Sequence, residues 1–304
     1  MVSHILYFCI SKNKLQMKLD GRRLSSNVDD RRGMSMGKTA GGLGIGGIII
    51  VGLLTMLFGG NPADVLQQVM GAGSAQIMTS DGRQPTAEEE ELAVFASQIL
   101  AGTEDVWTKI FRENGREYIA PKLVLYTDYV QTASGTASAS SGPFYNSGDQ
   151  TVYIDLSFFT TMKQQFGSAG DFAYAYVIAH EVGHHVQYLL GTLNSVHRQM
   201  RQMSEAQSNQ MSVRLELQAD FYAGVWAYND NKMFGSLEPG DVEEGLAIAQ
   251  RIGDDYLQKK ARGYTVPESF NHGTSAQRSR WLKKGLTTGD ITQGDTFAPD
   301  YRNL

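Results

Sequence analysis

Residues 171–191 read DFAYAYVIAHEVGHHVQYLLG, and this stretch decides how the rest of the fold is interpreted. Its apolar residues recur at helical spacing between Phe172 and Leu189. Asp171 can cap the start of a helix, and Gly191 offers a stop. The pattern therefore predicts one long helix that is apolar enough to be buried.

Within this helix, His180-Glu181-Val182-Gly183-His184 matches the pattern H-E-x-x-H. Residues four apart lie about one turn apart on the same helical face, so both imidazoles can reach one metal ion. Glu181 then stands beside the metal, where it can take a proton from a water molecule. Alternatively, His180 and His184 are core histidines satisfied by hydrogen bonds. Two histidines that flank a glutamate at this spacing favour a metal, namely Zn²⁺.

A catalytic zinc site needs a third protein ligand and leaves a fourth position for water. The extended histidine motif requires glycine and histidine where this chain has Gln187 and Leu190, so that motif is excluded. Glu216 and Asp220 lie four apart on a second, mostly apolar helical stretch. We expect Glu216 to bind the metal and Asp220 to accept a hydrogen bond from the far nitrogen of His180. A solvated acidic face is the alternative, but buried carboxylates need a partner.

The pairing of H-E-x-x-H with a later E-x-x-x-D resembles the gluzincin arrangement. The chain is also similar to a bacterial family of neutral zinc metallopeptidases that carry an N-terminal membrane anchor. The matching segments are Gly21-Arg22-Arg23, residues 27–33 (NVDDRRG), 142–145 (GPFY), 152–156 (VYIDL), 216–220 (ELQAD) and 271–273 (NHG). The resemblance implies an α+β, mainly helical, zincin-like metallopeptidase domain with a small β-sheet. It also implies Zn²⁺ as cofactor and a peptide or protein as substrate.

The chain departs from this family's pattern at two positions. Family members often carry a cysteine on either side of the G-P-F-Y segment, and Ser134 and Asn146 occupy those positions here. The loss of both together indicates a missing disulfide brace rather than a lost catalytic group.

Three further histidines need an assignment. His272 follows a loop that contains Pro267 and precedes a helix, so it could turn toward the metal and stabilise the oxyanion that forms when water attacks a carbonyl. A surface or capping histidine is the alternative. His185 lies about 100° around the helix from His184, and we expect it to contact packing neighbours or groups behind the ligands. His197 has no supporting constellation.

Two strands are expected before the metal helix, at residues 122–126 and 151–156, with a Ser/Gly/Ala-rich loop at 132–142 between them. A peptide substrate can add itself as another strand along an open sheet edge. Residues 152–155 or the adjoining 144–145 could be that edge. The alternative is an ordinary core strand with half-buried aromatic residues.

Charge is unevenly spread along the chain. Residues 1–38 hold eight Lys or Arg and three Asp, which leaves 19 basic and 29 acidic residues for the rest. An acidic body argues against nucleic acid as a partner. Residues 39–60, TAGGLGIGGIIIVGLLTMLFGG, carry no charge and are long enough to cross a lipid bilayer as one transmembrane helix. The alternative is a glycine-rich linker that leads to a buried strand.

The basic residues precede this segment, and the first basic residue after it is Arg83. The positive-inside rule then predicts a single-pass protein with a cytoplasmic head at 1–38 and a catalytic part that is periplasmic or extracellular. Residues 61–85 are expected to form a flexible stalk, and residues 86–304 the zinc metallopeptidase domain.

Two features of the N-terminal region bear on assembly and on the start of the chain. Gly42 and Gly46 form a G-x-x-x-G pair that could bring two membrane helices together, so a homodimer is a candidate assembly. Residues 1–16 look foreign to the rest, and Met17 is a candidate for the true start of translation.

These observations predict a membrane-anchored zinc peptidase, an endopeptidase rather than an exopeptidase. His180, His184 and Glu216 are expected to hold Zn²⁺, with Glu181 as the general base. One alternative is an anchored zinc-binding domain with an assembly or binding role and little hydrolytic activity. The other is a membrane scaffold without metal, which requires the whole constellation to be accidental.

Overall fold

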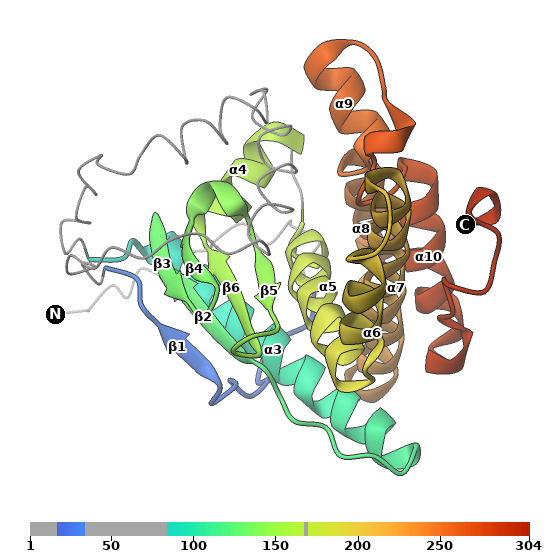
Figure 1. Ribbon diagram of the computed structural model, residues 1–304. Coiled ribbons are helices and arrows are strands. Elements are labelled where there is room, and N and C mark those ends of the chain that lie inside the picture. The colour runs from blue at the N-terminus through green and yellow to red at the C-terminus, as the bar shows by residue number, and fades with distance from the viewer. Residues whose placement is uncertain (1–16, 34–83, 167–169) are drawn as a thin grey trace, which may run out of the picture.

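The computed structural model describes residues 17–33, 84–166 and 170–304. They form a mainly helical body with two small sheets (Figure 1), which confirms the predicted α+β class. The helices are α3 (Ala87–Glu113), α4 (Ser157–Phe166), α5 (Asp171–Leu189), α6 (Thr192–Met200), α7 (Glu205–Phe234), α8 (Asp241–Arg251), α9 (Asp254–Arg262) and α10 (Ser275–Thr288). The strands are β1 (Val28–Asp30), β2 (Lys122–Tyr126), β3 (Tyr129–Thr132), β4 (Gly135–Ser138), β5 (Phe144–Asn146) and β6 (Thr151–Asp155).

The larger sheet has the strand order β1-β2-β6-β5. Strands β1, β2 and β6 run parallel, and β5 runs antiparallel to β6. Both predicted strands, at 122–126 and 151–156, are confirmed. Because β6 lies between β2 and β5, residues 152–155 are not an edge. In the described part of the chain, β1 and β5 each have a partner strand on one side only, so of the two predicted edge candidates the one at 144–145 lies on an edge strand.

The prediction of a loop at 132–142 is wrong in part, because β3 and β4 pair as an antiparallel hairpin. Small residues such as Ser, Gly and Ala give no alternating apolar pattern, so the sequence carried little strand signal. The hairpin forms because Val130 and Ala137 pack against Val124, Phe144 and Tyr153 on one face of the larger sheet.

Helix α5 is confirmed over 171–189, although Gly170 rather than Asp171 occupies the N-cap position. It is apolar around most of its circumference and therefore lies inside the main core, between the larger sheet and α7 (Figure 1). A Cβ atom on Gly183 would lie 3.1 Å from the Cα atom of Ala219 in α7. The glycine inside the H-E-x-x-H motif therefore lets the two helices approach closely.

Helix α10 lies against the opposite side of α7. A Cβ atom on Gly224 would collide with the carbonyl oxygen of Leu282, and one on Gly285 would collide with that of Phe221. These two glycines bring the helix backbones into direct contact. The contact carries the first turns of α10 toward the residues of α7 that face α5.

Residues 17–33 belong to the same folded body. Met17 and Leu19 lie in the main core, and β1 pairs with β2 in register Val28↔Leu123. Arg22 forms a nearly buried ion pair with Asp230 at 2.8 Å. This differs from the predicted division, in which residues 1–38 form a head separate from the domain. Arg22 and Arg23 are paired with acidic groups of the domain, whereas Arg31 and Arg32 are paired with Asp29 and Asp30 of their own segment.

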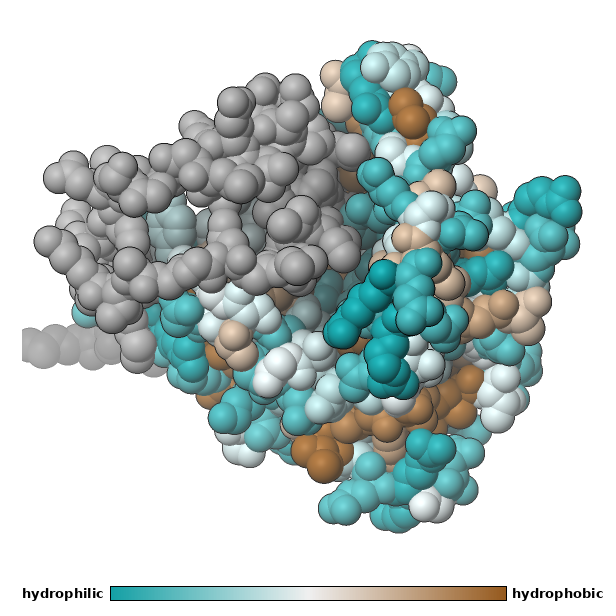
Figure 2. Space-filling model, viewed as in Figure 1, coloured by the Kyte–Doolittle hydropathy of each residue, from teal (hydrophilic) through white to brown (hydrophobic). Residues whose placement is uncertain are grey.

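Several predictions fall outside the described residues. They concern the span at 39–60 with Gly42 and Gly46, residues 1–16 before Met17, and nearly all of the stalk. Within the described ranges, no helix combines the length and the apolar character that a bilayer crossing requires. On the viewed face, the described surface is mostly hydrophilic or neutral, with hydrophobic side chains confined to smaller areas (Figure 2).

Candidate metal centre

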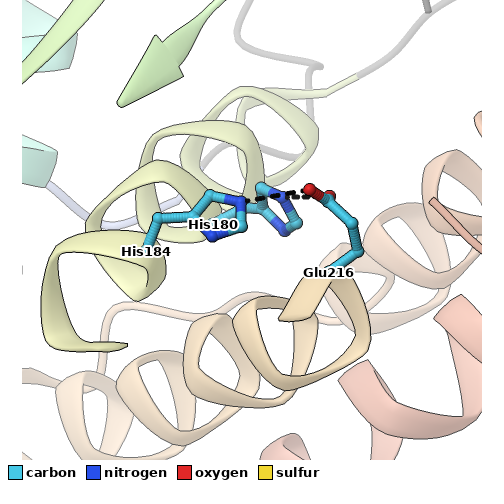
Figure 3. A group of neighbouring side chains, drawn as sticks. All are labelled: His180, His184 and Glu216. Carbon is cyan, nitrogen blue, oxygen red and sulfur yellow. Dashed lines mark hydrogen bonds and ion pairs between the residues drawn. The ribbon is translucent and has the colours of Figure 1, made fainter. Parts of the chain in front are cut away.

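Three side chains converge between α5 and α7 (Figure 3). The Nε2 atom of His180 lies 3.1 Å from one carboxylate oxygen of Glu216, and the Nε2 atom of His184 lies 3.5 Å from the other. One ligand atom from each residue fits within 4.8 Å of the other two. The structure thus brings together the three residues predicted as ligands. Two imidazole nitrogens and one carboxylate form the donor set of a catalytic zinc site.

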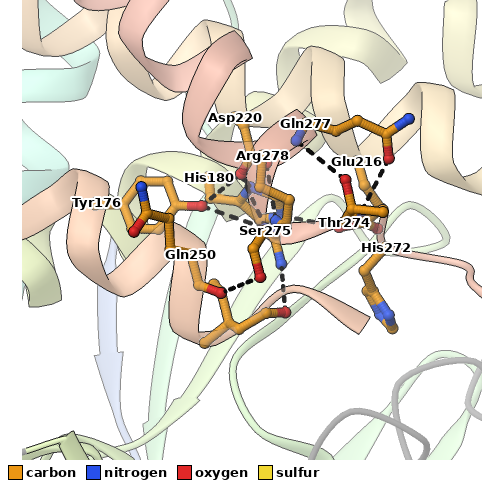
Figure 4. Close-up of polar contacts among 12 residues, drawn as sticks. Tyr176, His180, Glu216, Asp220, Gln250, His272, Thr274, Ser275, Gln277 and Arg278 are labelled. Carbon is orange, nitrogen blue, oxygen red and sulfur yellow. Dashed lines mark hydrogen bonds and ion pairs between the residues drawn. The ribbon is translucent and has the colours of Figure 1, made fainter. Parts of the chain in front are cut away.

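Behind His180 lies a buried polar network (Figure 4). Asp220 is fully buried, and it accepts hydrogen bonds from His180 Nδ1 at 2.8 Å and from the Tyr176 hydroxyl at 2.6 Å. The Arg278 guanidinium donates Nε–H and Nη2–H to the two oxygens of Asp220, each at 2.9 Å. Since an ionised carboxylate only accepts, Nδ1 of His180 carries a proton. Nε2 is then the nitrogen that can bind a metal, which would displace any proton there.

His184 is oriented by a different partner, Gln187, whose side-chain oxygen lies 2.9 Å from His184 Nδ1. The amide nitrogen of Gln187 donates to the carbonyl oxygen of Leu215 at 2.7 Å and to the side-chain oxygen of Gln218 at 3.1 Å. Both of these partners accept, so the Gln187 oxygen must face His184 and accept from Nδ1. The Nε2 lone pair of His184 is therefore also directed at the metal position.

The electrostatics of the group suit a divalent cation. Burial lowers the pKa of His180, but Asp220 and Glu216 outweigh this effect and raise it to about 10. Burial also lowers the pKa of His184, and Glu216 outweighs it in the same way. The pKa of Glu216 is held well below its usual range because the two imidazoles outweigh its burial. A metal ion bound between His180, His184 and Glu216 would supply a positive charge that Glu216 and Asp220 stabilise.

Glu181 is buried beside the ligands, on the wall of the cleft. Burial raises the pKa of its carboxyl group, while the neighbouring histidines partly oppose the shift. A carboxylate with a raised pKa accepts a proton more readily near neutral pH, as a general base must. Glu181 thus lines the same cleft as the three ligands, and its role as the base stays a prediction.

The metal position opens into a cleft with a volume of about 270 Å³. Its helical wall is formed by α5 and α7, which carry His180, Glu181, His184 and Glu216. Its strand wall is formed by β5, the β3–β4 hairpin and the loop between them. An apolar group, Phe158, Met162, Val177 and Ile252, also lines the cleft. The site is therefore a groove that has the candidate metal ligands and Glu181 on its helical wall and short strands on its other wall.

His272 also lines the cleft. Asp254, at the start of α9, holds its loop in place by accepting backbone N–H groups from residues 271, 272 and 273 at 2.9, 2.7 and 3.1 Å. The second oxygen of Asp254 lies 3.2 Å from His272 Nδ1. The carboxylate fixes the proton on Nδ1, so Nε2 is the nitrogen left to act in the cleft.

Several residues of the site escaped the sequence analysis. Tyr176 lies four residues before His180, and Gln187 lies three after His184, so helical spacing alone could have indicated both. Arg278 comes from α10, and no local pattern connects it with Asp220. The same holds for Asp254. Their proximity to the site depends on how distant helices pack.

His197, for which we found no supporting constellation, lines the cleft from α6. His185 contacts packing neighbours, as expected, through Tyr145 and the carbonyl oxygen of Ile119. Ser134 and Asn146, the two positions where the resemblance led us to expect cysteines, contact each other through hydrogen bonds of 3.0 to 3.2 Å.

Comparison with known proteins agrees with this geometry. A family model described as "Putative neutral zinc metallopeptidase" matches residues 17–297. The chain belongs to this family. That confirms the family predicted from the sequence and implies zinc at the His180, His184 and Glu216 cluster. The membrane anchor that accompanied the resemblance stays a prediction.

Relatives of the chain include proteins whose names state no activity. It is 45% identical over 287 residues to "Uncharacterized protein YpfJ" of Escherichia coli K12, covering 92% of this chain and 99% of that protein. It is 44% identical over 192 residues to "Uncharacterized protein Rv2575" of Mycobacterium tuberculosis, covering 60% of this chain and 64% of that protein. No solved structure matches the chain, so the zincin-like character of the fold stays a prediction.

Proposed function

We propose that the chain is a zinc-dependent endopeptidase. One observation carries the proposal: two imidazole Nε2 atoms and a carboxylate converge on the wall of a cleft, next to the buried carboxyl group of Glu181. Purely structural zinc sites close their fourth position with a protein ligand and need no base. Among the described residues, the cluster offers three ligands and lies on a cleft that a peptide can enter.

The chain's own residues have separate tasks in this proposal. Zinc, when bound, supplies a Lewis acid that makes a water molecule acidic near neutral pH. Glu181 takes the proton from the attacking water and later delivers it to the leaving amine. When it is protonated on both nitrogens, His272 donates from Nε2 to the developing oxyanion, while Asp254 accepts from Nδ1 and holds the imidazole in place. Asp220 keeps His180 in the tautomer that leaves Nε2 free.

The strand wall supports a mode of substrate binding. Strand β5 is an edge strand and lines the same cleft as His180. We propose that the substrate backbone lies along β5 as an added strand, so that main-chain hydrogen bonds hold the peptide beside the metal. The apolar group around Val177 would accept a hydrophobic side chain of the substrate.

The charges on the cleft favour cleavage inside a chain over removal of a terminal residue. Binding a free C-terminal carboxylate calls for an available cation. Among the described residues that line the cleft, Arg278 is the only Lys or Arg, and Asp220 occupies its guanidinium. Capturing a free amino terminus calls for a carboxylate, but Glu181 and Glu216 have tasks at the metal.

The decisive experiment combines metal analysis with digestion of a mixed peptide library by the full-length protein. We expect about one zinc per chain and cleavage by the wild type, and we expect Glu181→Gln to keep zinc but lose most of the cleavage. Glu113→Gln, an exposed carboxylate far along α3, serves as the matched control. Full activity of Glu181→Gln would overturn the assignment of the base. Zinc without any cleavage would favour the binding or assembly role.

We propose further that residues 17–33 and 84–304 share one compartment. The pairing of β1 with β2 and the ion pair between Arg22 and Asp230 support this. A single crossing of residues 39–60 would separate these partners by about 30 Å of hydrocarbon. The predicted orientation, with the head inside and the catalytic part outside, is therefore not retained.

Cysteine labelling tests the compartment. In a variant without Cys9, single cysteines are placed at Lys18 and at Lys109, whose side chains are 65% and 40% exposed. Intact cells are treated with a membrane-impermeant maleimide, before and after permeabilisation. We expect both positions to react under the same condition. Reaction of one position in intact cells and of the other only after permeabilisation would contradict the shared compartment.

A further inference from the structure

We propose that His185 is a positioning residue, which ties the edge strand β5 to the metal helix through Tyr145 and so sets the width of the cleft. The inference rests on the proposed peptidase function for its kinetic consequence. Its structural basis is independent of that function. It assigns a task to a buried histidine that follows directly after the ligand His184.

The hydrogen bonds of His185 define its tautomer. Its Nε2 atom lies 2.6 Å from the backbone carbonyl oxygen of Ile119, which can only accept, so Nε2 carries the proton. Its Nδ1 atom, 2.9 Å from the Tyr145 hydroxyl, must then accept the phenolic hydrogen. The His185 side chain has no exposed surface, and the ring of Tyr118 packs edge-on against it. The imidazole is therefore a fixed link with one donor and one acceptor in use.

Strand β5 depends on this link because it is short and at the edge. It has three residues, and β6 is its only partner strand in the described ranges. Side chains alternate along a strand, so Tyr145 faces the opposite side from Phe144 and Asn146. Phe144 packs into the cluster under the β3–β4 hairpin, whereas Tyr145 packs against the main core and α5. Tyr145 is thus the side chain by which the strand contacts the metal helix.

Helix α5 consequently positions both sides of the cleft. His184 presents its Nε2 atom to the metal position, and His185, about 100° further around the helix, holds the strand wall. A substrate that lies along β5 must place its scissile carbonyl beside the metal to within a fraction of an ångström. Loss of the link would let β5 move relative to the metal without touching any ligand.

The kinetic test uses full-length, zinc-loaded protein and fluorogenic peptides of increasing length. For Tyr145→Phe and His185→Gln we expect KM to rise about 2- to 10-fold for extended peptides, the range for one neutral hydrogen bond, with kcat and zinc content nearly unchanged. Short substrates that do not reach β5 should show no change. His185→Asn keeps an acceptor near the Nδ1 position and should restore KM to within about twofold of the wild type.

A matched control removes a tyrosine hydroxyl from the neighbouring strand. Tyr153 on β6 donates to Asp149 at 2.9 Å, on the side of the sheet away from α5, so Tyr153→Phe should leave KM unchanged. A second readout needs no hydrolysis: amide hydrogen exchange of residues 144–146 should speed up in Tyr145→Phe and His185→Gln, and no further in the double variant. Equal exchange in wild type and variants would overturn the inference. If the wild type cleaves no peptide, the proposed function fails while the exchange experiment still decides the link.

Discussion

On the helical wall of the cleft, the buried carboxylate of Asp220 is shared by Tyr176, His180 and Arg278, whereas on the strand wall a single neutral hydrogen bond joins Tyr145 to His185. The helical wall places ionised groups in the protein interior, where each charge needs its partner. The strand wall uses groups that stay neutral and cost little to bury once they are paired.

This difference indicates how each wall responds to damage. Removing one member of the charged network leaves another charge buried and unpaired, which costs far more than the bond itself is worth. Removing one member of a neutral pair costs about one hydrogen bond. Substitutions in the helical wall should therefore destabilise the protein strongly, whereas substitutions in the strand wall should cost little. This is expected if the helical wall carries the catalytic residues and the strand wall binds the substrate.

The largest effect is expected for Arg278→Met. The variant removes the guanidinium that is paired with buried Asp220. Loss of one partner of a buried ion pair costs about 3–5 kcal/mol of unfolding free energy. Urea denaturation of the metal-free protein measures the loss. Arg280→Met on the same helix, where the side chain donates to the backbone carbonyl of Leu304, is the control and should cost much less. Similar losses for both variants would mean that the network around Asp220 contributes no more to stability than a single hydrogen bond to the backbone does.

A double variant separates stability from metal affinity. Arg278→Met combined with Asp220→Asn removes both charges, so most of the stability lost in the single variant should return. Zinc affinity should not return, because a neutral amide raises the basicity of His180 less than a carboxylate does, and loss of such a partner typically costs about 10- to 100-fold. Competition with a zinc chelator measures this. Recovery of wild-type affinity would show that Asp220 does not tune the ligand.

A pH experiment probes the strand wall through His185. Burial outweighs the hydrogen bond to Ile119 and lowers the pKa of His185 to about 4, from about 6.5 in an unfolded chain. The unfolded state then binds more protons between these values, so this contribution is present above pH 6.5 and is lost as the pH falls toward 4. Between pH 7 and pH 5 the loss is about 2 kcal/mol.

The measurement is made on metal-free protein, since zinc release would add its own pH dependence. The unfolding free energy of the wild type minus that of His185→Gln should fall by this amount as the pH falls from 7 to 5, and it can change sign. A difference that stays constant over this interval would mean that His185 titrates normally in the folded protein.

The comparison of the two walls also explains what the sequence could reveal. The ligands and Asp220 were predictable because helical spacing places His180 with His184 and Glu216 with Asp220. Arg278 was not, because its contact with Asp220 arises from the close approach of α7 and α10 at Gly224. Helical periodicity thus reveals the metal ligands and Asp220. The residues that hold them in place, such as Arg278, depend on packing between distant segments.

The sequence was less informative about the strand wall and the N-terminal segment, because both depend on contacts between distant parts of the chain. Strand β4 of the hairpin, Gly135–Ser138, consists of small residues without an apolar alternation. The hairpin is held by contacts with strands that lie elsewhere in the chain. Arg22 and Arg23 were counted only as charges that precede residue 39, because their partners, Asp230, Glu104 and Asp105, lie far away in the sequence. A charge pattern describes how many charges a segment has, but it does not identify their partners.

The smallest effects are expected for Ser134 and Asn146, which form a hydrogen-bonded pair on the strand wall. Ser134 is exposed, so water can replace its hydroxyl in Ser134→Ala, and the unfolding free energy should fall by roughly 0.5 kcal/mol or less. Asn146 is 8% exposed and also accepts the N–H of Gly148 at 2.8 Å, so Asn146→Ala should cost about 1–2 kcal/mol. Thermal and urea unfolding of the two variants measure the difference. If Ser134→Ala proved as costly as Asn146→Ala, the hydrogen bonds between these two residues would themselves stabilise the strand wall, as a disulfide at these positions would.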